Sequence, residues 1–91
     1  MDFEILSSFA FGRALAQDKN GFFHVKREND QLMPAYEARY TKIYAYEHYF
    51  GEALALVGTN GEFFFINQVG NRAEEKSSLT LMKSYTRLFS D

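Results

Sequence analysis

Histidine is the side chain best suited to acid–base or metal chemistry near neutral pH, and the chain contains two, His24 and His48. Glu47 could join them around a metal ion, but neither histidine has a ligand-type residue four positions away on an evident helix. Alternation along a strand places His24 opposite Phe23 and Val25. We therefore expect both imidazoles to be hydrogen-bonded locally, and we predict neither a metal site nor a cofactor.

Residues for covalent catalysis are no better organised. The chain has no cysteine, and none of its serines stands in a Gly-x-Ser-x-Gly turn. The adjacent acids Glu74 and Glu75 match the start of a helix rather than a catalytic pair. Glycine-rich phosphate-binding motifs are also missing. We therefore predict no catalytic residues and favour a protein that is not an enzyme.

The aromatic content is the most informative feature of the composition. Ten Phe and six Tyr occur among 91 residues, and acidic and basic residues are interspersed to a net charge of −2. This balance disfavours nucleic-acid binding, although aromatic and basic residues alternate around Tyr40 and Tyr44. No apolar run is long enough to span a membrane, and Asp2 and Glu4 replace the basic start of a secretory signal. A cytoplasmic location is therefore expected.

Two Asn-Gly pairs lie between apolar runs and predict β-hairpins, because both residues tolerate the left-handed backbone of a tight turn. The first hairpin covers residues 14–23 and turns at Asn20 and Gly21. The second has residues 52–57 and 62–68 as its arms and residues 58–61 as its connection. An amphipathic helix over residues 44–57 is the alternative to its first arm.

The ends of the chain are predicted from their apolar spacing and capping residues. Residues 72–89 have a helical apolar stripe, with Asn71 and Glu74 as a capping-box-like start, and a short strand over residues 79–82 is the weaker alternative. Residues 2–11 fit either a helix or an edge strand. The resulting fold class is α+β. One domain over residues 1–91 would contain an antiparallel sheet of four to five strands, with the C-terminal helix packed on one face.

The second arm of the second hairpin is apolar on both faces. In an extended segment Phe63 and Phe65 point to one side, and Phe64 and Ile66 point to the other. One helix covers only one face, so the N-terminal segment, a second copy, another protein or a ligand must cover the other.

Of these covers, we favour a second copy of the chain, because two-fold homodimers are the commonest oligomers. The predicted function is thus that of a non-enzymatic protein–protein interaction module. It could be an accessory or inhibitor-type protein. A second protein partner is also compatible with this prediction. The alternative is a small-molecule-binding module with a groove lined by Tyr and Phe; single-stranded nucleic-acid binding ranks below both. The predicted binding residues are aromatic: Tyr40, Tyr44, Tyr46, Tyr49, Phe63 and Phe65.

Overall fold

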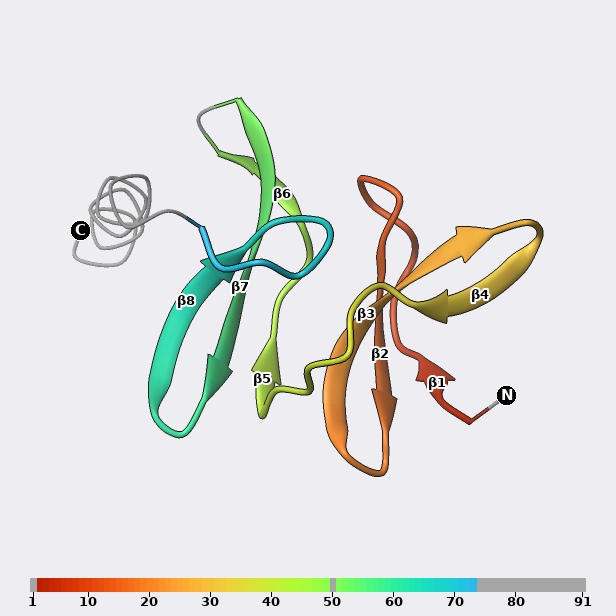
Figure 1. The fold of residues 1–91 in the computed structure, drawn as a ribbon, viewed down its shortest axis with the longest axis horizontal. Helices are drawn as coiled ribbons and strands as arrows, with labels where there is room; N and C mark the ends of the chain where they lie inside the picture. The colour runs from red at the N-terminus through yellow and green to blue at the C-terminus, as the bar shows by residue number, and fades with distance from the viewer. Residues whose placement is uncertain (1, 50, 74–91) are drawn as a thin grey trace.

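A computed structural model describes residues 2–49 and 51–73, which form two antiparallel sheets that lie next to each other (Figure 1). The first sheet has the order β1-β2-β3-β4, and in the second sheet β7 pairs with β5, β6 and β8. The strands of the first sheet are β1 (Glu4–Ile5), β2 (Ala14–Asp18), β3 (Gly21–Glu28) and β4 (Gln31–Pro34). Those of the second sheet are β5 (Lys42–Ile43), β6 (Glu47–Tyr49), β7 (Glu52–Thr59) and β8 (Glu62–Ile66).

The α+β fold class predicted from the sequence was wrong, because the described residues form two sheets and no helix. Residues 74–89 of the predicted C-terminal helix lie outside the described residues. Its first two residues are extended: Arg72 forms a bridge with Ile66, and the Ala73 N–H donates to the Phe65 carbonyl at 2.9 Å. Within residues 2–49 and 51–73, no helix is long and apolar enough to cross a membrane.

Both predicted hairpins are present, but the first turns at Lys19 and Asn20 and not at Asn20 and Gly21, because Gly21 in β3 already pairs with Asp18. β2 and β3 pair from Ala14↔Val25 to Asp18↔Gly21, and β7 and β8 pair from Ala55↔Ile66 to Thr59↔Glu62. The alternative helix over residues 44–57 is therefore wrong, since β6 and β7 occupy that region. The N-terminal segment, for which helix and edge strand were both open, forms the short edge strand β1 against β2.

The two sheets are joined at Tyr40 and Thr41, whose backbones form hydrogen bonds with different sheets. Tyr40 exchanges two hydrogen bonds of 2.9 Å with Phe22 in β3. The next residue, Thr41, donates from its N–H to the Gly58 carbonyl in β7 at 2.9 Å. Neighbouring residues of the chain thus pair with different sheets, and the segment before β5 serves as the corner between them.

The core is divided into three apolar clusters. One contains Tyr40, Tyr46, Ala55, Val57 and Ile66, and a second contains Ala14, Ala16, Phe23 and Val25. Half-buried Tyr36 packs against both. The third contains Leu54, Leu56 and Phe65. Because side chains alternate along a strand, the first and third clusters lie on opposite faces of the β7–β8 hairpin.

A substitution at Gly21 tests how closely the backbone of Tyr40 approaches β3 at the corner between the sheets. Its φ is +135°, and a Cβ there would lie 2.9 Å from the Tyr40 carbonyl oxygen. We expect Gly21→Ala to lower the free energy of unfolding by roughly 2–4 kcal/mol, since strain and a backbone clash act together. Denaturant unfolding measures this change. Gly61→Ala is the matched control, because φ there is +78° and nothing lies within 4 Å of the added Cβ. A cost at Gly21 no larger than at Gly61 would contradict the close approach.

Candidate functional site

The six predicted binding residues do not share one surface. Tyr40, Tyr46 and Phe65 are buried at 7%, 2% and 0% exposure. Tyr44 and Phe63 are exposed at 48% and 40%, and Tyr49 is half-buried with its ring 5.2 Å from that of Phe65. Tyr40 and Tyr46 belong to one core cluster, whereas Phe65 belongs to another. Of the six, Tyr44 and Phe63 are the most accessible to a partner.

Part of the second face of the β7–β8 hairpin is buried in a single copy of the chain, whereas Phe63 on the same face is 40% exposed. Leu54, Leu56 and Phe65 are at most 6% exposed, and among the described residues Tyr49 and Ala73 pack against them. Phe3 and Ile5 of the N-terminal segment instead pack on the cluster of β2 and β3. Leu54, Leu56 and Phe65 are therefore buried without a second copy, and Phe63 is the residue of this face that stays exposed.

Among residues 2–49 and 51–73, the most buried polar side chain joins the two sheets. His24 in β3 is 1% exposed, and its Nε2 lies 2.9 Å from the Tyr44 carbonyl oxygen between β5 and β6. A carbonyl can only accept, so Nε2 carries the proton and Nδ1 of the neutral ring accepts from the Tyr36 hydroxyl at 2.6 Å. The Tyr46 ring packs 4.5 Å from the imidazole. His24 thus has partners at both nitrogens.

Burial sets the protonation of this group. It lowers the pKa of His24 to about 4, and the positive charge of Arg13 acts in the same direction, against the hydrogen bond to Tyr44. Burial also raises the pKa values of Tyr36 and Tyr46 above the ordinary phenol value. At neutral pH the imidazole is uncharged and both phenols keep their protons. Because none of the three side chains changes its protonation near neutral pH, they are suited to stabilising the junction of the two sheets rather than to exchanging protons with a substrate.

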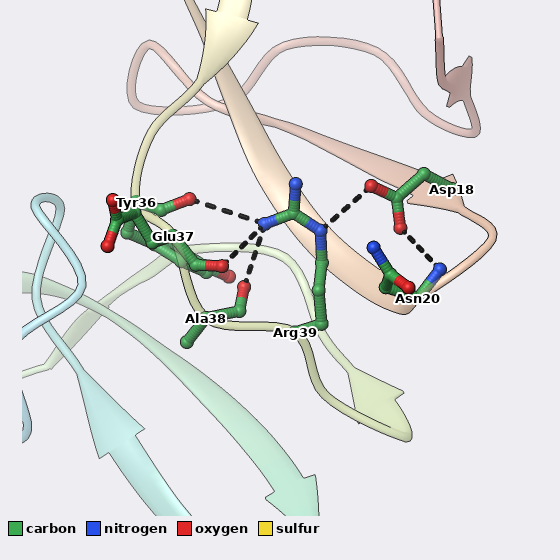
Figure 2. Close-up of polar contacts among 6 residues, drawn as sticks. All are labelled: Asp18, Asn20, Tyr36, Glu37, Ala38 and Arg39. Atoms are coloured by element: carbon green, nitrogen blue, oxygen red, sulfur yellow. Dashed lines mark hydrogen bonds and ion pairs between the residues drawn. The ribbon is translucent and has the colours of Figure 1, made fainter.

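A second polar group surrounds Arg39, just before the corner (Figure 2). Its Nε donates to Asp18 Oδ2 at 3.0 Å, and its Nη1 donates to the carbonyls of Glu37 at 2.9 Å and Ala38 at 3.1 Å. The guanidinium carbon lies 3.8 Å from the centroid of the Phe23 ring. These partners all belong to this chain, so the arrangement fastens residues 36–39 to the β2–β3 hairpin.

The Asp18 carboxyl is held in its ionised form by the same group. Partial burial opposes ionisation, but the Asn20 N–H and the Arg39 guanidinium outweigh it, so the pKa of Asp18 is lowered. Asp18 also borders a shallow depression together with Asp2 and Lys19. Across residues 2–49 and 51–73, no group of three or more His, Asp and Glu side chains is placed to hold a metal ion.

Exposed apolar side chains gather on two adjacent loops. Among the described residues, six large apolar side chains are exposed, and four of them belong to residues 6–13 or 67–71. The loops are joined by hydrogen bonds from Arg13 Nε to the Gln68 carbonyl at 3.0 Å and from Gln68 Nε2 to the Phe11 carbonyl at 2.6 Å. We call these four residues the loop patch: Leu6, Phe9, Phe11 and Val69, which are 42%, 39%, 47% and 60% exposed.

The loop patch was missed by the sequence analysis, which treated residues 2–11 only as a candidate core element. A signal was present, because Phe11 precedes Gly12 and a Phe-Gly pair occupies the place of the Asn-Gly turns. Nothing local indicates that Val69 lies near Phe11, since 58 positions separate them along the chain.

Comparison with known proteins adds no functional assignment. No protein-family model matches the chain, and no curated protein or solved structure is significantly similar to it. The function must therefore be inferred from the chain itself.

The buried imidazole predicts a defined pH dependence. The pKa of His24 falls from 6.5 to about 4 on folding. Between these values the unfolded chain binds a proton that the folded chain does not, so stability decreases as pH falls through this window. The expected loss is about 3 kcal/mol, measured by denaturant unfolding across pH 4 to 7.

The matched variants for this prediction are His24→Gln and His48→Gln. The first should be less stable at neutral pH and should lose this part of the pH dependence. The second replaces an exposed imidazole and should retain the wild-type slope. Equal slopes in the wild type and the His24 variant would show that the imidazole is not the titrating group.

The planar guanidinium predicts that Arg39→Lys is not conservative. A lysine ammonium cannot reach Asp18 and two carbonyls while it lies flat on Phe23. We expect the free energy of unfolding to fall by about 1–3 kcal/mol. Thermal unfolding of Arg39→Lys beside Arg27→Lys tests this, since Arg27 is exposed. Equal melting temperatures for the two variants would refute the structural role of Arg39.

Proposed function

We propose that this chain is a non-enzymatic protein-interaction module that self-associates as a dimer through its loop patch. The observation that carries the proposal is the gathering of four exposed apolar side chains on two loops that are hydrogen-bonded to each other. Exposed apolar patches on small proteins commonly mark interaction surfaces. A cytoplasmic location is part of the same proposal.

The size of the loop patch bears on the strength of association. Taking about 150–250 Å² for each large side chain, the exposed fractions correspond to roughly 300–450 Å². A standard stable interface buries about 800 Å² on each partner. The loop patch therefore supports a weak, reversible dimer rather than a permanent one.

A positively charged side chain lies against one residue of the loop patch. Phe9 lies under Arg27, with 5.4 Å between the guanidinium carbon and the ring centroid. On the same strand, Lys26 forms an ion pair with Glu28 at 3.0 Å. Because side chains alternate along β3, this ion pair lies on the face opposite Arg27 and does not border Phe9. A second copy is proposed as the partner because two-fold homodimers are the commonest oligomers.

Sedimentation velocity over a wide concentration range tests this proposal. The average mass of the wild type should rise reversibly toward that of a dimer at high concentration. Val69→Ser should weaken this association at least tenfold, because it removes the most exposed apolar side chain of the patch. Phe63→Ser is the matched control, since Phe63 is exposed on β8 outside the patch.

Two outcomes would overturn the proposal. A wild-type chain that remains monomeric at every concentration would exclude self-association. A dimer that is weakened by Phe63→Ser and not by Val69→Ser would move the interface from the loops to the exposed sheet residues.

A further inference from the structure

An asparagine followed by a glycine is chemically labile as well as typical of turns. The backbone nitrogen of the second residue attacks the side-chain amide of the first, and glycine makes this approach easiest because it has no Cβ. The chain contains two such pairs, Asn20-Gly21 and Asn60-Gly61. The sequence alone gives both pairs the same reactivity, whereas the structure places them in different surroundings.

Gly61 lies in an open turn. Asn60 and Gly61 are both exposed and occupy the two central positions between the paired residues Thr59 and Glu62. Their φ values are 52° and 78°. A Cβ built on Gly61 would have nothing within 4 Å of it. No neighbour in the described chain therefore opposes the change of backbone dihedral angles that brings the Gly61 nitrogen to the Asn60 side chain.

Gly21 is enclosed in the corner between the sheets. It is the first residue of β3 and pairs with Asp18. A Cβ there would lie 2.9 Å from the Tyr40 carbonyl oxygen and 3.3 Å from Arg39 Cβ. The Asn20 N–H donates to Asp18 Oδ1 at 2.9 Å, and the backbone N–H of Gly21 interacts with the same carboxylate. This negative charge disfavours loss of the Gly21 amide proton, which the attack requires.

The β3–β4 turn separates the effect of an open turn from that of glycine. Asn29 and Asp30 are both exposed and have φ values of 53° and 64°, so the backbone resembles that of the β7–β8 turn. Asp30, however, places a Cβ and a charged side chain beside the attacking nitrogen. Of these three turns, only that of β7–β8 combines a following glycine with an unenclosed backbone nitrogen.

We infer that Asn60 is a site of covalent modification by spontaneous deamidation, from which the fold protects Asn20. The Gly61 nitrogen gives its proton to a solvent base and forms a bond to Asn60 Cγ. The bond from Cγ to the side-chain nitrogen breaks, and this nitrogen leaves as ammonia after taking a proton from water. One water molecule then opens the resulting succinimide ring at either of its two carbonyl carbons, which gives aspartate or isoaspartate. No oxidant, reductant or enzyme is required.

The products change the tip of the β7–β8 hairpin in two ways. A carboxylate replaces a neutral amide, so the net charge of −2 becomes more negative by one. The isoaspartate form also inserts a methylene group into the backbone of a two-residue turn, which disturbs the pairing of Thr59 with Glu62. Both forms are therefore separable from the original chain by ion exchange.

Peptide mapping by mass spectrometry, during incubation in mildly alkaline buffer, measures deamidation at each asparagine in one sample. In the folded wild type we expect Asn60 to react at least about tenfold faster than Asn20 and Asn29, because local opening is easiest in exposed turns with few contacts. In denaturant the fold no longer encloses Gly21. Asn20 and Asn60 should then react at similar rates, while Asn29 should remain slow.

Two variants provide matched controls. Gly61→Ala places a Cβ beside the attacking nitrogen, so it should slow the reaction at Asn60 and leave Asn20 unchanged. Asp18→Ala removes the carboxylate that holds the first turn, so it should accelerate the reaction at Asn20 and leave Asn60 unchanged.

Three outcomes would contradict this assignment. Equal rates at Asn20 and Asn60 in the folded chain would show that the corner gives no protection. A rate at Asn60 no faster than that at Asn29 would exclude Asn60 as a modification site. An unchanged rate at Asn20 in Asp18→Ala would refute the protective role of the carboxylate.

Discussion

The two sheets depend on a single buried imidazole at their junction. His24 connects β3 to the Tyr44 carbonyl of the second sheet and to the Tyr36 hydroxyl of the connecting segment. It can do so because it is neutral, since one ring nitrogen must donate while the other accepts. An aliphatic side chain at this position would remove a partner from two groups in a buried region, where a missing hydrogen bond is costly. The junction therefore requires His24 to be both buried and uncharged.

The same junction explains why tyrosines predicted for a binding surface lie in the core. Tyrosine is amphipathic and common in interfaces, which made the run from Tyr40 to Tyr49 a reasonable candidate. In the structure the Tyr46 hydroxyl donates to the Asn67 carbonyl, 21 residues away, and its ring packs on His24. A buried tyrosine needs an acceptor, and this acceptor comes from a distant loop. Local sequence cannot reveal that pairing.

The predictable parts of the fold are those determined by neighbouring residues. Two Asn-Gly pairs located the two hairpins, and at Asn60-Gly61 the predicted left-handed turn is present because its chemistry is local. At the first hairpin the turn lies one residue earlier, since Gly21 pairs with Asp18. The corner at Tyr40 was not predictable, because its partners are Phe22 and Gly58. The C-terminal helix failed at its first turn for a related reason. Asn71, expected to cap a helix, instead closes the loop after β8 by donating its N–H to Asn67 Oδ1 and accepting from the Asn67 N–H.

The position of the loop patch links binding to the docking of the sheets. Residues 6–13 connect β1 to β2 of the first sheet, and residues 67–71 follow β8 of the second. Gln68 joins the two loops through its hydrogen bonds with Arg13 and Phe11. A partner that covers both loops recognises only a chain whose sheets are docked. By linkage, such a partner stabilises the junction, and any change that separates the sheets weakens binding.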